Sequence, residues 1–188
     1  MLASLQRVAV VGSVGSGKTT LARELAYRIG VQHIELDSLR YQPDWTEVPD
    51  RIFRDKVVAI VGMNQWVIDG NYADVQDIIW LQAQLVVWID FPILITLWRL
   101  LRRTFSRLLI KDTFADGNRE QLRRLFGSQS ILVWAIRSHW RRRKLYEQLL
   151  AQSRYAHLQV VRLRSPSAVR NWLAGMPGPE QDSKIEAK

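Results

Sequence analysis

One stretch constrains this chain more than any other, the run from Gly12 to Thr19 that reads GSVGSGKT. An apolar run, residues 7–11, precedes it, and a helical pattern begins at Lys18. Glycines at this spacing between a strand and a helix let the backbone approach phosphate oxygens closely. Backbone amides and the positive end of the helix then face those oxygens. We therefore expect nucleotide phosphates to be bound by Gly12, Ser13, Val14, Gly15, Ser16, Gly17, Lys18, Thr19 and Thr20.

Two residues of this loop indicate which cofactors it takes. Lys18 stands where it can reach the β- and γ-phosphates, and the Thr19 hydroxyl is the usual Mg²⁺ ligand of such a loop. Mg²⁺ also takes one or two carboxylates, besides phosphates and water. Asp69, at the end of the run Trp-Val-Ile-Asp, is the preferred carboxylate, whereas we expect Asp90 to have a structural role. The pattern predicts that ATP and Mg²⁺ are the cofactors.

Apolar runs alternate with helical patterns along most of the chain. Strands are expected at residues 8–11, 31–36, 66–68, 85–89 and 158–163. Helices are expected at residues 18–29, 50–61, 92–103, 131–151 and 166–173, the second of them capped by Asp50. This alternation predicts an α/β fold, in which a parallel sheet covered by helices on both faces binds ligands beyond the carboxyl ends of its strands. Because Asp37, Asp69 and Asp90 end three of these strands, we expect them to converge near the phosphate loop.

The composition fits one soluble domain. The 188 residues are 47% hydrophobic, enough for a sizeable core, and we expect a single domain over residues 1–174 with a lid insertion at about 104–140. Residues 175–188 are expected to form a disordered tail. The absence of cysteine excludes disulfides and cysteine metal sites, and no stretch reads as a leader or membrane span. We therefore expect a cytoplasmic protein. No metal-ligand spacing links the three histidines, which are expected in ordinary core or surface positions: His33, His139 and His157.

The net charge of +9 is concentrated in one segment. Residues 99–144 hold 13 of the 27 lysines and arginines but only 3 of the 18 acidic residues. Two interpretations of this segment stay open. Its arginines can close over transferring phosphates as a lid, or the segment can bind nucleic acid, with Trp134 and Trp140 available to stack on bases.

Longer phrases carry a resemblance to a known group. They read GSVGSGKTTLAREL, HIELDSLRYQPDWTEVP, WVIDGNY, VVWIDFP and VVRLRSPSAVRNWL, and they cover most of residues 7–173. The chain resembles the adenylate-kinase-like P-loop kinases and, more closely, the bacterial proteins called DNA topology modulation proteins. The resemblance implies a three-layer P-loop kinase sandwich whose five parallel strands have the order 2-3-1-4-5, with a basic helical lid. It also implies a kinase.

On the donor side, the resemblance assigns three arginines beside Lys18. Arg99 is similar to the arginine that stacks on the donor adenine, and Arg103 to one that contacts phosphates. Arg142, four residues before Tyr146, is similar to a later arginine that also contacts phosphates. We expect Lys18, Asp37, Arg99, Arg103 and Arg142 to be the catalytic residues.

On the acceptor side, Arg40 is similar to the arginine that holds an acceptor phosphate, and Asp69 to the aspartate that acts through the Mg²⁺ shell. The family's second acceptor-phosphate arginine is absent, because Asn71 and Tyr72 follow Gly70. Kinases of the shikimate or gluconate type place an aspartate near the acceptor hydroxyl, and Asp37 suits that role. Expected substrate-binding residues are Asp37, Arg40, Trp45, Asp69, Asn71 and Tyr72.

The sequence thus predicts an ATP- and Mg²⁺-dependent kinase that acts on a small molecule or a nucleotide. The identity of this acceptor does not follow from the sequence pattern. A guanine-reading Asn/Thr-Lys-x-Asp motif and a transporter-type Leu-Ser-Gly-Gly-Gln motif are both absent, which disfavours those classes. Two other hypotheses stay open. One is an ATP-regulated nucleic-acid-binding protein, and the other is a slow ATPase.

Overall fold

A computed structural model describes residues 5–42, 46–109 and 131–176. Its centre is one sheet of five strands, all parallel where they pair, with the order β2-β3-β1-β4-β5. The strands are β1 Arg7–Gly12, β2 His33–Glu35, β3 Trp66–Asp69, β4 Leu85–Ile89 and β5 Gln159–Leu163. The predicted strand order is therefore confirmed. The three central strands are almost continuously apolar because helices cover both of their faces.

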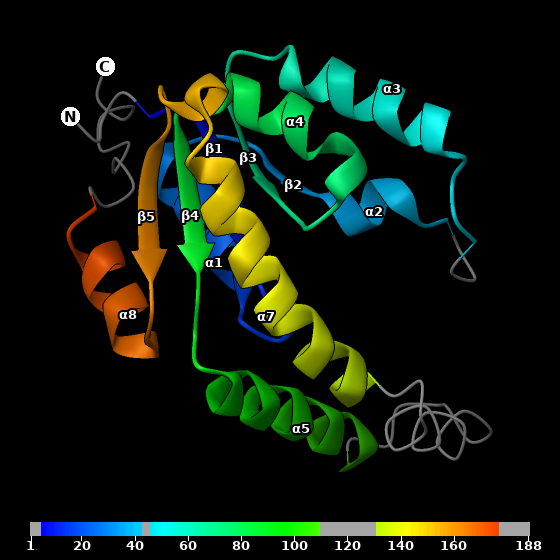
Figure 1. Cartoon of the computed structure of the whole chain (residues 1–188), viewed down its shortest axis with the longest axis vertical. Helices are drawn as coiled ribbons and strands as arrows, with labels where there is room; N and C mark the ends of the chain where they lie inside the picture. The colour runs from blue at the N-terminus through cyan, green and yellow to red at the C-terminus, as the bar shows by residue number, and fades with distance from the viewer. Residues whose placement is uncertain (1–4, 43–45, 110–130, 177–188) are drawn as a thin grey trace, which may run out of the picture.

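Helices alternate with the strands along the chain. They are α1 Lys18–Ile29, α2 Leu36–Arg40, α3 Asp50–Val61, α4 Ala73–Gln82, α5 Ile93–Leu109, α7 Ile131–Leu150 and α8 Pro166–Ala174, with a short 3₁₀ turn, η2, at Ser153–Tyr155. On one face of the sheet, a cluster around Phe53, Trp80 and Tyr146 joins α3, α4 and α7. On the other, Leu25 of α1 packs with partly buried residues of α8. This is the predicted three-layer arrangement (Figure 1).

The helices α5 and α7 reach beyond the carboxyl ends of the strands (Figure 1). The phosphate loop lies at the same edge, because it connects the end of β1 to the start of α1. Residues 110–130, most of the expected lid, lie outside the described residues, as does the expected tail from residue 177. Within the described ranges, no helix is long and apolar enough to cross a membrane.

Four local expectations are corrected by the structure. The second strand ends at Glu35, and Asp37 lies in the first turn of α2 rather than at a strand end. The helix α3 begins at Asp50 after Pro49, so Asp50 is not its cap. The helix α4 was not expected, because its sequence is apolar on most sides and lacks a clear helical period. The helix α5 continues past residue 103 to Leu109.

Candidate functional site

The phosphate loop has the backbone geometry that its glycines predict. Gly12 has φ 154°, and a Cβ there would lie 2.6 Å from the carbonyl oxygen of Ile89. Gly15 has φ 77°, a left-handed value that other residues adopt only with strain. Gly17 precedes α1 without a side chain that could cap it, so the first-turn N–H groups of the helix remain available to an anion. Lys18 Nζ donates to the carbonyl of Ser13 at 3.2 Å, which holds the ammonium over the loop.

The two predicted metal-ligating residues lie together. Thr19 Oγ1 donates to Asp69 Oδ2 at 2.8 Å, and Asp69 is buried at the end of β3. A hydroxyl beside a buried carboxylate at the first turn of α1 is a donor set that suits Mg²⁺ bound to nucleotide phosphates. Thr19 and Asp69 therefore fit the cofactor that the sequence predicts.

His33 also belongs to this cluster, which was not anticipated. Its Nε2 lies 2.7 Å from Asp69 Oδ1, so both oxygens of that carboxylate have partners. The contact follows from the sheet, since β2 pairs with β3 and His33 is in register with Val67, two residues before Asp69. Spacing along the chain could not indicate it, whereas the predicted strand order places these residues on neighbouring strands.

Asp90 has the structural role that was expected. Its buried carboxylate accepts hydrogen bonds from Arg162 of β5, with Nη2 to Oδ2 at 2.6 Å, and lies 3.5 Å from Nε of Arg143 on α7. Arg162 also covers the ring of Trp88 at 4.0 Å. Asp90 thus joins α7 to the sheet.

One of the predicted arginines, Arg99, reaches the phosphate loop. Arg99 of α5 donates from Nη1 to the carbonyl of Ser16 at 2.9 Å and lies 5.0 Å from the ring centre of Phe91. Arg142 is partly buried on α7, and this burial lowers the pKa of its guanidinium, which still stays charged at neutral pH. The side chain of Arg103 lies outside the described residues.

A groove of about 770 Å³ opens beside the loop, between α1, α5 and α8. This is the volume of a small-ligand site. Its walls combine apolar surface with the loop residues Ser16 and Gly17 and the side chain of Arg99. The remaining lining residues are Thr20, Leu21, Arg23, Glu24, Tyr27, Ile89, Phe91, Pro166, Val169, Arg170 and Leu173.

On the opposite side of the loop, Asp37 and Tyr72 form a pair. The Tyr72 hydroxyl donates to Asp37 Oδ1 at 2.6 Å. Burial, and next the hydrogen bond to Asp37, raise the pKa of Tyr72 above its ordinary range, so the phenol stays protonated and keeps donating. Asp37 is exposed to solvent and is therefore accessible to a small molecule. Trp45, predicted to lie near this site, falls outside the described residues.

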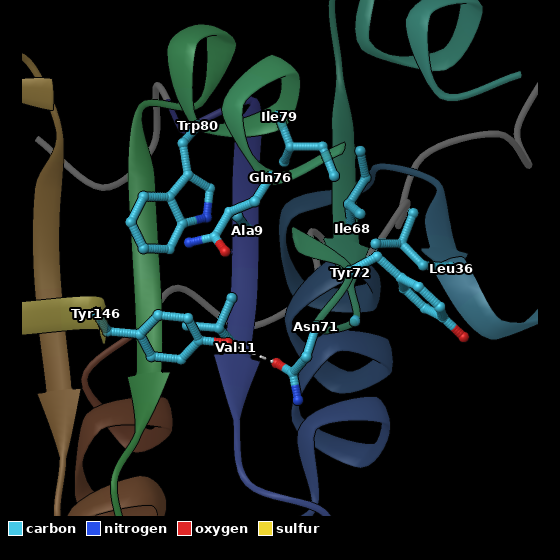
Figure 2. A pocket seen from close by; sticks show the side chains of 11 residues that line it. Ala9, Val11, Leu36, Ile68, Asn71, Tyr72, Gln76, Ile79, Trp80 and Tyr146 are labelled. Carbon is cyan, nitrogen blue, oxygen red and sulfur yellow. Dashed lines mark hydrogen bonds between the residues drawn. The ribbon is translucent and has the colours of Figure 1, made fainter. Parts of the chain in front are cut away.

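Asn71 bridges the phosphate loop and α7. Its Oδ1 accepts from the N–H of Gly12 at 3.3 Å and from the Tyr146 hydroxyl at 3.0 Å, and its Nδ2 donates to the Gly12 carbonyl at 2.5 Å. Figure 2 shows the amide pointing toward the phenol, with a dashed line for their hydrogen bond. Both residues line a cavity of about 10 Å³, which has room for one water at most. Burial raises the pKa of Tyr146 to about 12, so its hydroxyl remains a donor. The amide predicted to touch the substrate is thus largely occupied by the loop itself.

A second histidine reaches the loop from α7. His139 Nδ1 lies 3.1 Å from Ser13 Oγ, and the imidazole is almost fully buried. Burial, the largest cause, lowers the pKa of His139, so the ring is neutral at physiological pH. Ser13 and His139 are 126 positions apart in the sequence, so no local pattern could have indicated this contact.

Comparisons with solved structures place this architecture among known kinases. A gluconokinase from Sinorhizobium meliloti 1021 matches with a TM-score of 0.53 and 16% identity, covering 90% of each chain. A shikimate kinase from Bacteroides thetaiotaomicron matches with a TM-score of 0.53 and 13% identity, covering 91% of this chain and 96% of its own. A shikimate kinase from Acinetobacter baumannii in complex with shikimate matches with a TM-score of 0.52 and 18% identity, covering 92% and 91%.

Sequence comparisons add no closer relative. No protein-family model matches the chain, and no curated protein matches it. The similarity to solved structures therefore concerns the fold, and the sheet order and helical layers agree with it. The chain has the fold of the P-loop kinases.

Proposed function

We propose that this protein is an ATP- and Mg²⁺-dependent kinase that transfers the γ-phosphoryl group to a hydroxyl of a small acceptor. One observation carries the proposal. The phosphate loop lies between a nucleotide-sized groove on the side of α1, α5 and α8 and the accessible carboxylate of Asp37 at the start of α2. A loop that only bound or hydrolysed ATP would not need the second site.

The donor nucleotide is held by the loop and the groove. Backbone amides of residues 12–19 and the Lys18 ammonium bind the phosphates, with Lys18 at the β- and γ-oxygens. The nucleoside lies in the groove, where Arg99, supported by the ring of Phe91, presents a guanidinium face to the base. Thr19 and Asp69 would hold Mg²⁺, which, when bound, neutralises charge on the β- and γ-phosphates.

The acceptor hydroxyl is oriented by Asp37. The Tyr72 hydrogen bond fixes one carboxylate oxygen and leaves the other to accept the acceptor's proton. The acceptor oxygen then bonds to the γ-phosphorus while the bond from that phosphorus to the ADP oxygen breaks. Arg142 supplies positive charge from α7 toward the transferring oxygens. We propose that the enzyme works in the cytoplasm, where ATP is supplied. We also propose a relation to the DNA topology modulation proteins, which the shared sequence motifs support.

The experiment that tests this proposal is ³¹P NMR of the protein with Mg-ATP and a panel of acceptors. A phosphate ester that appears with one acceptor and disappears in Lys18→Ala supports the kinase. The exposed Lys56 of α3 provides the matched control, since Lys56→Ala removes one ammonium away from the loop and should retain full transfer. Retention of full activity by the Lys18 variant, or production of only ADP and phosphate at one rate with every acceptor, would refute it.

A further inference from the structure

We infer that the acceptor is a hydroxyl compound without a phosphate or carboxylate group, such as a sugar, polyol or amino sugar. This inference rests on the kinase function proposed above and narrows its substrate class. It differs from what the resemblance to adenylate kinases implies, where an arginine holds the phosphate of a nucleotide acceptor. Three features of the molecule support it: the contacts of Arg40, the contacts of Asn71 and the charge around them.

Both terminal nitrogens of Arg40 are held by carboxylates. Nη1 donates to Asp50 at 2.6 Å and Nη2 to Glu47 at 2.7 Å. The guanidinium lies 5.4 Å from the ring centre of the buried Phe53, and the side chain is only 13% exposed. A phosphate at Arg40 would have to compete with these two carboxylates, one at each terminal nitrogen of the guanidinium.

The backbone keeps these carboxylates next to Arg40. Tyr41 and Glu47 form an antiparallel bridge, and the N–H of Val48 donates to the Arg40 carbonyl at 2.8 Å. Asp50 is fixed by its place in the first turn of α3. Glu47 and Asp50 therefore belong to the local fold around Arg40 and are not chance surface contacts.

The second position at which an anion could be held is also occupied. The family's second acceptor-phosphate arginine would stand at Ala73, and the neighbouring amide of Asn71 is engaged by Gly12 and Tyr146. Arg40 and Asn71 thus both have polar atoms engaged by other residues of the protein.

The local charge reinforces this conclusion. Residues 35–51 hold five carboxylates and only two arginines, in a chain whose net charge is +9. Among the described residues of this stretch, four carboxylates stand against two arginines. This excess of negative charge disfavours phosphates and carboxylates relative to neutral or cationic hydroxyl compounds. Hydroxyl and ammonium groups can donate hydrogen bonds, and the carboxylate oxygens near Asp37 can accept them.

The first test is a calorimetric titration of AMP into protein saturated with Mg²⁺ and a non-hydrolysable ATP analogue, so that AMP cannot occupy the donor site. Wild-type protein should not bind AMP at millimolar concentration. The double variant Glu47→Gln, Asp50→Asn should bind it at least about tenfold more tightly, because Arg40 is released and two negative charges are removed. Adding Arg40→Met to that double variant should abolish the gain.

A matched control separates this local effect from bulk charge. Asp55 and Asp74 are exposed on α3 and α4, so Asp55→Asn with Asp74→Asn removes the same net charge away from Arg40 and should not create AMP binding. AMP binding by the wild type that Arg40→Met abolishes would overturn the inference. The inference would also be overturned if the Glu47→Gln, Asp50→Asn variant gained AMP binding that Arg40→Met does not abolish. The same holds if that variant gained no AMP binding while its affinity for the ATP analogue stayed unchanged.

A phosphoryl-transfer assay with matched acceptors is the second test of the acceptor class. Glucose, glucosamine, gluconate and glucose 6-phosphate share one carbon skeleton and differ in charge. Phosphorylation of glucose or glucosamine supports the inference. Phosphorylation of gluconate, glucose 6-phosphate or AMP overturns it but still supports the proposed kinase activity. Failure of all acceptors counts against the proposed kinase, whereas the AMP titration still decides whether this side of the protein can hold a phosphate.

Discussion

At the scale of single residues, the buried carboxylate of Asp69 is the best-defined feature of the site. Thr19 and His33 engage its two oxygens from α1 and β2, so the orientation of the carboxylate is fixed before any ligand binds. Partners of this kind orient metal ligands, and their loss commonly weakens metal affinity by about 10- to 100-fold. His33 is therefore a positioning residue for the proposed Mg²⁺ site.

We predict that His33→Leu weakens the apparent affinity for Mg²⁺ by about tenfold or more, because Asp69 loses the donor that fixes Oδ1. His33→Gln should retain most of the affinity, since its amide can present an N–H near the place of Nε2. The measurement is the Mg²⁺ dependence of binding of a fluorescent ATP analogue. The exposed His157 provides the control, and His157→Leu should behave as wild type. Equal Mg²⁺ dependence in all four proteins would show that the contact has no part in metal binding.

At the scale of elements, α7 connects the sheet to the phosphate loop. Its residues reach three places: His139 contacts Ser13, Arg143 approaches Asp90, and Tyr146 donates to Asn71. The helix position and the loop conformation are therefore coupled through side chains about one turn apart. Docking of α7 should respond to the protonation of His139, whose imidazole is buried beside the loop.

We predict that protonation of His139 destabilises the folded protein. Burial, the largest cause, lowers the pKa of His139 below its ordinary value, Arg143 lowers it further, and Asp90 opposes them. Between about pH 6.5 and the lower folded-state pKa, the unfolded chain binds the proton first, so stability falls as the pH is lowered through this window. His139→Asn should reduce the loss of unfolding free energy between about pH 7.5 and about pH 5.5, measured in urea. His157→Asn should show the full wild-type loss, and an equal loss in the His139 variant would contradict the prediction.

The elements also show where sequence patterns suffice and where they do not. Strands such as Leu85–Ile89 could be predicted because buried parallel strands are short apolar runs followed by a turn signal. The helix α4 could not, because its polar residues are spread around the helix and leave no clear apolar period. Contacts such as Ser13 with His139 depend on packing between distant segments, so no local spacing could reveal them. Thr19 and Asp69 were predictable, because the loop motif and the strand end each fix one of the two.

At the scale of the whole molecule, acidic and basic residues are concentrated in different parts of the chain. The described acidic residues of 35–51 lie on or beside α2 and at the start of α3, on the proposed acceptor side. The described basic residues of 99–144 lie on α5 and α7. Several of the described cations of α7 are directed inward, since Arg143 approaches Asp90 and Arg142 is partly buried. Among the side chains that the structure describes, the cations at the surface of α5 and α7 are Arg102, Arg137, Arg141 and Lys144.

These surface cations allow a prediction about nucleic acid. Trp98 and Trp140 are 65% and 60% exposed on the same two helices, so bases could stack on them. Four described cations would release about three counterions from a single strand, which gives a slope near −3 in log affinity against log salt. We expect single-stranded DNA to bind weakly with a slope of about this size, with the same affinity in the presence and absence of Mg-ATP, because these cations lie outside the nucleotide groove. Fluorescence anisotropy across a salt series measures both quantities. A change of about tenfold in affinity on adding Mg-ATP would instead favour an ATP-regulated nucleic-acid-binding protein, with the basic helices as its contact surface.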